Sequence, residues 1–257
     1  MSESNTLANI RIVLIQTSHP GNIGSAARAM KTMGISTLYL VKPKSFPDAQ
    51  ATTMSANAHD ILENAVVVEH LQDALVGCKW VVGSSARDAR SLSWDVLDAR
   101  NCGEQAVKKA TTANVALVFG RESSGITNDE LALCHSLVHI PTNPEYSSLN
   151  LASAVQLLSY ECRVASLSLV LDSQANTEDQ TKVENQSKKE KHVDIVTVDA
   201  MESYYHHLET SMIEAGFLDP ENPKHLMTRL RRLYARTEIS SSELNILRGM
   251  LVAFQKK

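Results

Sequence analysis

The chain has 257 residues and a formal net charge of −4, and 43% of its residues are hydrophobic. This composition excludes wholesale disorder, and the length suits one large α/β domain with a smaller domain beside it. Because the overall charge is slightly negative, a nucleic-acid partner cannot be inferred from it and would require a local basic patch.

The four cysteines lie far apart, with no short spacing between any two. This pattern argues against a zinc site and against a disulfide framework, and it is typical of a reducing compartment. The histidines also lack metal-ligand spacing, so we predict no metal site. The N-terminal residues contain no basic and apolar stretch typical of export signals, and we therefore expect a cytoplasmic protein.

One long apolar segment runs from Leu149 to Leu171 and has the length of a membrane span. Glu161 and Arg163 interrupt it, and Ser, Asn and Gln residues are scattered through it. Since charged side chains are costly inside a membrane, we predict a buried helix that could also form a subunit interface, and no membrane association.

Short apolar runs alternate with helical segments over the first 140 residues. This alternation predicts an α/β fold with a parallel sheet covered by helices on both faces. The expected strands cover Ile10–Ile15, Thr37–Val41, Ala65–Glu69, Trp80–Gly83, Val115–Phe119 and Leu137–Ile140. The expected helices cover Ile23–Met33 (ended by Gly34), Asp48–Ala58, Leu71–Val76, Gly103–Ala110 and a long segment from Leu149.

The composition changes abruptly at Asp172. Residues 172–194 contain no Phe, Trp, Tyr, Leu or Met and are rich in polar and charged residues, which is typical of a flexible linker. We therefore predict a first domain at 1–171, a linker at 172–194 and a small helical module at 195–257. The module's expected helices are Val198–Ala215, Pro223–Arg236 in whose first turn Pro223 fits, and Ser240–Phe254, where Ser240 and Glu243 have capping-box spacing.

Three glycine- or proline-containing loops follow predicted strands and lead into helices. They read PGNIGSAAR at 20–28, FGRESSG at 119–125 and IPTNPEYSSLN at 140–150. Ligands of open parallel sheets bind at the carboxyl ends of the strands, so the three loops are expected to build one site. The first loop lacks the G-x-G-x-x-G pattern and no G-x-x-x-x-G-K-[ST] occurs, which lowers the expectation of a nicotinamide enzyme or an NTPase without excluding either.

These three segments resemble the three motifs of SPOUT-class RNA ribose 2′-O-methyltransferases, and those of the TrmJ-type tRNA methyltransferases in particular. The resemblance covers residues 10–170 in order and extends to the helical module. It implies a homodimer that uses S-adenosylmethionine, with a trefoil knot that periodicity alone would not predict. It also implies methylation of the ribose of cytidine or uridine at anticodon-loop nucleotide 32 of tRNA.

The resemblance assigns cofactor binding to segments after three of the strands. Backbone groups of tight loops can bind an adenine edge, and a glycine allows close approach of the backbone. The matching residues are Ser84, Ser85, Ala86, Gly120, Ile140, Ser147, Ser148 and Leu149.

Arg28 is the residue that the resemblance places at the reaction, together with Ser148 and Asn150. Because a guanidinium stays protonated, stabilising the developing alkoxide or holding a phosphate suits Arg28 better than removing a proton. Without the motif, Arg28 would be an exposed arginine in the first turn of a helix, and Ser148 and Asn150 would be helix caps.

Four further residues of the motifs are candidates for substrate contact. Asn22 either holds the first loop, caps a helix or touches the substrate. Glu122 could anchor an arginine or an amide of a cofactor loop, and would need a raised pKa to act as a base. Arg121 and Tyr146 are weaker candidates for contact with a phosphate or a base.

The helical module contains a basic segment, because residues 224–236 include five Lys or Arg and no acidic residue. Arg229, Arg232 and Arg236 share one face of the expected helix, while Leu226, Leu230 and Leu233 are expected to face the module's core. An ordinary solvated face is the alternative. Next to an RNA-methylating domain, we predict a surface that binds tRNA phosphates.

Two other classes of function remain open from the sequence. One is a non-catalytic RNA- or nucleotide-binding module with the same fold, although Arg28, Ser148 and Asn150 together favour an enzyme. The other is a Rossmann-like oxidoreductase. Calorimetry with S-adenosylmethionine and with NADH would separate the three classes.

Overall fold

The first domain is built on a seven-stranded, all-parallel sheet with the strand order β3-β2-β1-β6-β4-β7-β5. The computed structural model describes residues 3–85, 95–178 and 194–255. All six predicted strands are present, and the two-residue strand β5 is an addition. The strands are β1 (Ile10–Ile15), β2 (Thr37–Val41), β3 (Val66–Val68), β4 (Cys78–Ser84), β5 (Val96–Leu97), β6 (Asn114–Phe119) and β7 (Ser136–Val138).

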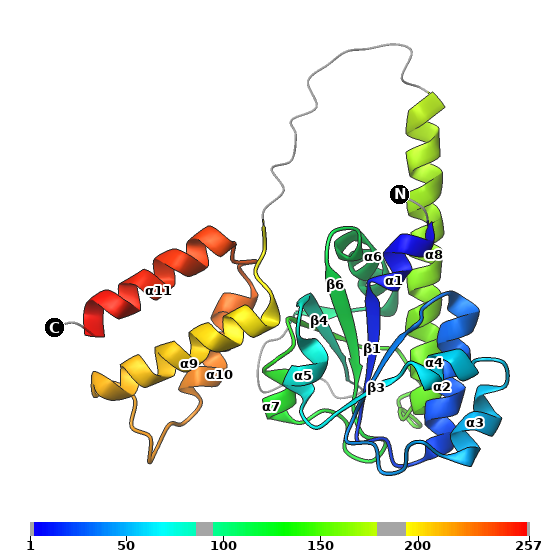
Figure 1. Cartoon of the computed structure of the whole chain (residues 1–257), viewed down its shortest axis with the longest axis horizontal. Coiled ribbons are helices and arrows are strands. Elements are labelled where there is room, and N and C mark those ends of the chain that lie inside the picture. The colour runs from blue at the N-terminus through cyan, green and yellow to red at the C-terminus, as the bar shows by residue number, and fades with distance from the viewer. Residues whose placement is uncertain (1–2, 86–94, 179–193, 256–257) are drawn as a thin grey trace.

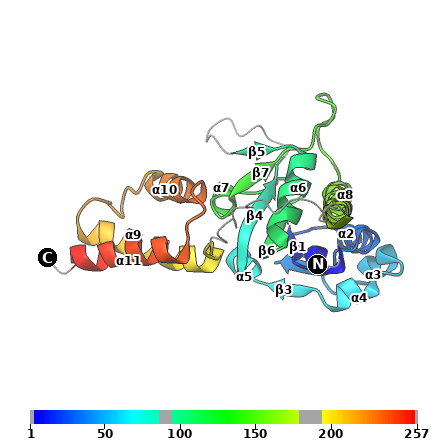
Figure 2. The same cartoon turned by 90° about the horizontal axis from the view of Figure 1, so that it is seen from above.

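Helices cover both faces of the sheet, as predicted (Figure 2). Successive residues of β1 alternate between two buried clusters, with Ile12 and Leu14 in one and Val13 and Ile15 in the other. The first cluster contains residues of α1 (Glu3–Ala8), α2 (Pro20–Met33), α3 (Ala49–Ser55), α4 (His59–Glu63), α6 (Ala99–Ala110) and α8 (Leu151–Glu178). The second contains residues of α5 (Leu71–Leu75) and the segment that follows α7 (Asn128–Leu131).

Helix α2 begins at Pro20, three residues earlier than the sequence predicts, because proline suits the first position of a helix. It ends as predicted at Gly34, whose φ of 83° is left-handed. Arg28 therefore lies in the third turn and not in the first. The helix expected at 48–58 is present as the shorter α3, which ends at Ser55, and α4 follows as a helix that the sequence did not predict.

Helix α8 continues seven residues past Leu171, into the segment predicted as linker (Figure 1). Its part Leu151–Leu171 is long and apolar enough to cross a membrane by length and composition alone. However, this part packs against α2 and α6, and Val155, Leu158 and Cys162 are buried. The opposite side of α8 exposes Tyr160, Leu167 and Leu171.

The C-terminal module contains three helices, α9 (Val198–Glu214), α10 (Leu226–Ala235) and α11 (Ser241–Gln255), close to the predicted bounds. The predicted capping box is present, because the backbone N of Ser240 donates to Glu243 Oε2 at 2.8 Å. Pro223 precedes α10 and is not in its first turn. The expectation for Leu233 is wrong, since its side chain is 50% exposed. The residues of α10 that pack on the module's core are Met227, Leu230 and Tyr234.

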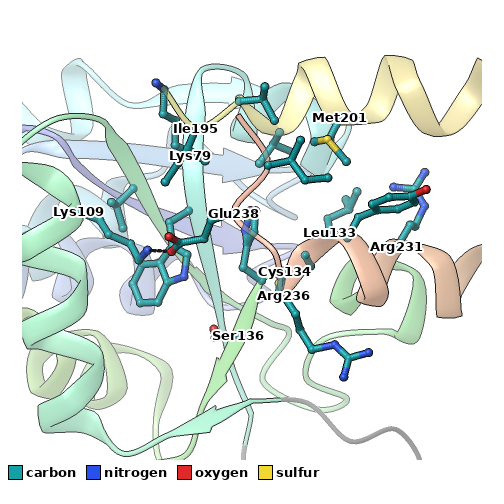
Figure 3. Close-up of a pocket in the computed structure, with 18 of the residues that line it drawn as sticks. Lys79, Lys109, Leu133, Cys134, Ser136, Ile195, Met201, Arg231, Arg236 and Glu238 are labelled. Atoms are coloured by element: carbon teal, nitrogen blue, oxygen red, sulfur yellow. Dashed lines mark hydrogen bonds and ion pairs between the residues drawn. The ribbon is translucent and has the colours of Figure 1, made fainter. Parts of the chain in front are cut away.

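The module contacts the first domain near the amino-terminal ends of β4 and β6. Val198 of α9 is buried in the second cluster of the sheet, and the backbone N of Gly77 donates to Asp199 at 2.9 Å. A cavity of about 590 Å³ lies between the two parts (Figure 3). Its lining includes Lys79 and Lys109 from the sheet domain, Arg231 from α10 and Arg236, which directly follows α10.

Candidate active site

The carboxyl ends of four neighbouring strands are aligned at one edge of the sheet. Phe119 at the end of β6 pairs with Leu14 of β1 on one side and with Ser84 of β4 on the other. Ser84 in turn pairs with Val138 of β7. The segments that begin with Gln16, Ser85, Gly120 and His139 therefore leave the sheet side by side. The sequence prediction that these loops share one edge is confirmed.

The second loop is closed on itself by a pair of backbone hydrogen bonds. The N of Arg121 donates to the O of Gly125 at 3.1 Å, and the N of Gly125 donates back to the O of Arg121 at 2.9 Å. A β-carbon on Gly120 would lie 2.2 Å from the carbonyl carbon of Gly125, which is far closer than atoms can approach. Glycine is therefore required at 120 by the loop's own backbone.

Glu122 joins the second loop to the first. Its carboxylate accepts hydrogen bonds from the backbone N and the Oγ of Ser18 at 3.1 and 2.9 Å, and from Asn22 Nδ2 at 3.1 Å. Partial burial raises the pKa of Glu122, but the bonds from Ser18 and Asn22 outweigh it and lower the pKa to about 2. Glu122 therefore anchors the backbone amide of Ser18 in the first loop and, among the described residues, neither an arginine nor an amide of an expected cofactor loop. With this lowered pKa it is a poor proton acceptor at neutral pH.

Asn150 connects the third loop to the first. Its Nδ2 donates to Asn22 Oδ1 at 3.1 Å, while its Oδ1 accepts from the N of Ala152 at 2.9 Å and so caps α8. Asn22 is not a helix cap, because the N-cap of α2 is His19. Glu122, Asn22 and Asn150, one from each motif, thus form a continuous hydrogen-bond network.

Arg121 lies in an ion pair inside the protein. Its Nη1 and Nη2 donate to the two carboxylate oxygens of Glu130 at 2.9 and 2.8 Å, and its Nε donates to Gln16 Oε1 at 2.8 Å. The side chains of Arg121 and Glu130 are only 19% and 16% exposed. Partial burial raises the pKa of Glu130, but the bonds from Arg121 and Thr127 outweigh it and lower that pKa.

The other predicted site residues lie on exposed segments or at strand ends. Ser147, Ser148 and Leu149 are exposed, Tyr146 is 80% exposed, and Ser84, Ser85 and Ile140 are half-buried. Ala86 lies outside the described residues. Arg28 is exposed on α2, and its guanidinium has no hydrogen bond or ion pair with residues of the described ranges. The structure therefore does not bring Arg28 into the Glu122–Asn22–Asn150 network.

Three residues of this edge were missed from the sequence: Gln16, Ser18 and Glu130. For Glu130 there was a signal, because Thr127 and Glu130 have the spacing of a capping box, and both of its hydrogen bonds are present. Gln16 and Ser18 are ordinary polar residues after a strand. Their partners depend on β1 lying beside β6, which the sequence does not reveal.

The basic face of α10 is only partly open. Arg229 and Arg236 are exposed, whereas Arg232 is half-buried, and burial together with the nearby charge of Arg236 lowers the pKa of Arg232. Arg231 belongs to a different face, because it pairs with Glu202 and lies over the ring of Tyr205, 4.5 Å from its centroid.

Comparisons with known proteins match both parts of the chain. Residues 9–160 match the SpoU rRNA Methylase family, and residues 199–257 match the family described as tRNA methyltransferase TrmJ, C-terminal domain. The tRNA (cytidine/uridine/adenosine-2′-O-)-methyltransferase TrmJ of Pseudomonas aeruginosa (strain UCBPP-PA14) is 52% identical over 251 residues, which are 97% of this chain and 95% of that protein.

Two solved structures are also similar over nearly the whole chain. TrmJ from Z. mobilis ZM4 has a TM-score of 0.79 at 27% identity, covering 95% of this chain and 98% of its own. A probable methylase family protein from Haemophilus influenzae Rd KW20 has a TM-score of 0.60 at 43% identity, covering 97% of each chain.

The family match covers more than half of the chain, and the relatives align with it along almost its full length. The all-parallel sheet and its covering helices agree with the SPOUT-type fold predicted from the sequence. The chain is a methyltransferase that belongs to the SpoU methylase family and, with its C-terminal module, to the TrmJ type.

Proposed function

We propose that this protein transfers a methyl group from S-adenosylmethionine to the ribose 2′-hydroxyl of cytidine or uridine at nucleotide 32 of tRNA. The observation that carries the proposal is the Glu122–Asn22–Asn150 network, which joins the three motifs at the carboxyl edge of the sheet. The names of the relatives supply tRNA and the ribose of cytidine and uridine. The assignment of nucleotide 32 rests on the resemblance of the three motifs to those of the TrmJ-type methyltransferases.

The groups at this edge suit a nucleoside cofactor. Adjacent strand ends at Ser84–Ser85, Gly120 and Ile140 offer backbone donors and acceptors for an adenine edge, and Ile140 and Leu149 offer apolar surface. We include Ala86, Ser147 and Ser148 in the cofactor site on the strength of the motifs. When bound, S-adenosylmethionine supplies an electrophilic methyl group, so the protein's task is chiefly to position the ribose oxygen.

Each motif has a distinct role in this proposal. Arg28, free of protein partners among the described residues, stabilises the alkoxide that develops on the ribose or holds the neighbouring phosphate. Ser148 orients the hydroxyl, and Asn150 fixes the start of α8 beside Asn22. Glu122, with its lowered pKa, holds the first loop and does not remove the proton.

A homodimer formed through α8 is part of the proposal. Tyr160, Leu167 and Leu171 are spaced by seven and then four residues, so they share one stripe of the helix. All three are large, apolar and exposed, with Leu171 at 65%. Because the other side of α8 is already packed on α2 and α6, this stripe is available to a second subunit.

The C-terminal module is proposed to hold the tRNA by its phosphates through the basic face of α10. Arg229 and Arg236 are exposed, and Arg232 lies between them. Tyr146, on the third loop, is exposed enough to contact an RNA base. A tRNA substrate agrees with the cytoplasmic location predicted from the sequence.

Labelled cofactor tests the proposed reaction directly. tRNA is incubated with the protein and S-adenosylmethionine carrying a deuterated methyl group, and the digested nucleosides are analysed by mass spectrometry. We expect the label on the ribose of cytidine or uridine, in the fragment that contains nucleotide 32. Label on a base would contradict 2′-O transfer, and ribose label at another nucleotide would contradict the assigned position.

A further inference from the structure

We propose that Arg121 is a positioning residue that, held by Glu130 and Gln16, fixes the Gly120–Gly125 loop and thereby sets the affinity for S-adenosylmethionine. The inference rests on the proposed function, because Gly120 belongs to the proposed cofactor site. It gives Arg121 a role other than the phosphate or base contact expected from the sequence.

All three nitrogens of the Arg121 guanidinium donate hydrogen bonds to protein groups. The two carboxylate oxygens of Glu130 accept hydrogen bonds from Nη1 and Nη2 in a bidentate pair, and Gln16 Oε1 accepts one from Nε. Such a pair fixes the plane of the guanidinium as well as its position. Since the pair is mostly buried, Arg121 has little capacity left for an RNA phosphate.

Gln16, one of the two partners of Arg121, directly follows the end of β1. Gln16 has a φ of 46°, in the left-handed region that residues with a β-carbon rarely adopt. Its backbone N is held by the O of Val41 at 2.7 Å, so the conformation is imposed by the neighbouring strand. Backbone conformations of this kind persist where the surrounding structure holds them, and they are common in functional loops. Here the strained residue supplies the acceptor for Arg121.

Glu130, the other partner of Arg121, lies in the short helix α7. Glu130 Oε2 accepts the backbone N of Thr127 at 2.8 Å while also accepting Arg121 Nη1. Together with the hydrogen bonds between Arg121 and Gly125, this closes the loop at both ends. Because Gly120 is packed tightly against Gly125, a loosened Arg121 would move the backbone of Gly120.

Arg121 and its neighbour Glu122 have separate partners. Arg121 binds Gln16 and Glu130, while Glu122 binds Ser18 and Asn22, which leads on to Asn150. The contacts of Arg121 therefore stabilise the cofactor loop, and the contacts of Glu122 stabilise the residues assigned to the ribose. Substitutions of Arg121 or of its partners should alter cofactor affinity more than the turnover number at saturating cofactor.

Gln16 offers a matched pair of variants. Both Gln16→Ala and Gln16→Glu keep a β-carbon at the same strained φ, but only Gln16→Glu keeps an acceptor for Nε. In the full-length protein, calorimetry should show that Gln16→Ala and Arg121→Lys raise the Kd for S-adenosylmethionine about tenfold, as expected for a lost hydrogen bond to a charged group. Gln16→Glu should stay near wild type, and kcat at saturating cofactor should change less than Kd in every variant.

Arg231→Lys is the control, because Arg231 and Glu202 form a second Arg–Glu pair in the C-terminal module, away from this edge. It should leave the Kd unchanged. Hydrogen exchange of the Arg121 and Gly125 amides, measured without cofactor, gives an independent readout. These amides should exchange faster in Gln16→Ala than in wild type, Gln16→Glu or Arg231→Lys.

Unchanged loop exchange and unchanged Kd in both Gln16→Ala and Arg121→Lys would overturn the proposal. A raised KM for tRNA with unchanged cofactor Kd would also overturn it, since Arg121 would then touch the substrate. If wild-type protein binds no S-adenosylmethionine, the proposed function fails, and the exchange rates still decide whether Arg121 fixes the loop.

Discussion

Asn150 donates a hydrogen bond of 3.1 Å from its Nδ2 to Oδ1 of Asn22, a residue 128 positions earlier in the chain. The orientation of the Asn22 amide is fixed by Glu122, because only a nitrogen donor can face an ionised carboxylate. The oxygen of Asn22 is therefore left to accept from Asn150. The Asn22 side chain therefore links the loop after β6 to the starts of α2 and α8 and fixes their relative positions.

Replacing Asn22 with Asp tests this network. The variant keeps the size of the side chain but puts a second carboxylate beside Glu122. At pH 7 we expect a loss of roughly 1–3 kcal/mol in the free energy of unfolding, because a hydrogen bond to a charged group is replaced by repulsion. In urea unfolding, the loss should exceed that of Asn22→Ala at pH 7 and approach it at pH 4. Equal losses for the two variants at pH 7 would contradict the network.

The lowered pKa of Glu122 predicts a pH dependence of stability. Its folded-state pKa, about 2, lies below the ordinary value of 4.5. The ionised carboxylate therefore stabilises the folded protein above about pH 4.5, and this contribution is lost as the pH falls from 4.5 towards 2. Urea unfolding of wild type and Glu122→Gln should show a difference at pH 7 that shrinks by pH 3. A difference that does not change with pH would mean that Glu122 has an ordinary pKa.

Gly120→Ala tests the closed loop. Because the new β-carbon would meet the backbone of Gly125, the loop must shift, at a cost of about 1–3 kcal/mol typical of overpacking, and cofactor affinity should fall. Gly249→Ala is the control, since Gly249 lies in α11 with open space around it. The control should raise the stability by up to about 1 kcal/mol. Equal effects of the two variants on cofactor affinity would exclude a special role for Gly120.

Arg28→Ala separates catalysis from cofactor binding. Loss of one positioned donor for developing charge usually lowers the rate by about 10²–10³, and Arg28 lies outside the proposed cofactor segments. We therefore expect kcat to fall by this factor while calorimetry gives an almost unchanged Kd for S-adenosylmethionine. Arg100→Ala, an exposed arginine of α6, should retain wild-type turnover. Retention of more than a tenth of the turnover in Arg28→Ala would exclude the role proposed for Arg28.

The basic face of α10 predicts how tRNA binding depends on salt. Each phosphate contact adds up to about 0.9 to the slope of log affinity against log salt, less for unpaired strands. Replacing Arg229 and Arg236 together with alanine should flatten this slope by up to two contacts. Arg231→Gln should change it much less, because Arg231 is already paired with Glu202. An unchanged slope in the double variant would show that this face does not meet RNA.

Much of the sheet could be predicted from the sequence, because its strands are buried on both faces and read as continuous apolar runs. Strand β5 could not, since two residues carry no periodicity. The face of α10 was ambiguous because two sets of residues fit a helix face: Leu226, Leu230 and Leu233 are spaced by four and three residues, and Met227, Leu230 and Tyr234 by three and four. The aromatic cluster of Tyr204, Tyr205 and Tyr234 decides between them, and it exposes Leu233.

For the site, the sequence located the motifs but not their contacts. Asn22 and Glu122 were both candidates for substrate contact, and nothing in either segment shows that they bind each other. That contact follows from the position of β1 beside β6. Arg121 was a candidate for contact with a phosphate or a base because its partners could not be identified: Gln16 follows β1 and Glu130 lies in α7, and they meet Arg121 only in the folded chain.

A crystal structure of the protein with S-adenosylmethionine would show whether the carboxyl edge of the sheet is the cofactor site. We expect the nucleoside to contact Ser84–Ser85, Gly120 and Ile140. The cavity of about 590 Å³ lined by Trp80, Tyr205 and Tyr234 is the competing location, at the opposite ends of β4 and β6. Cofactor bound in that cavity, with the carboxyl edge empty, would show that the proposed cofactor site is wrong.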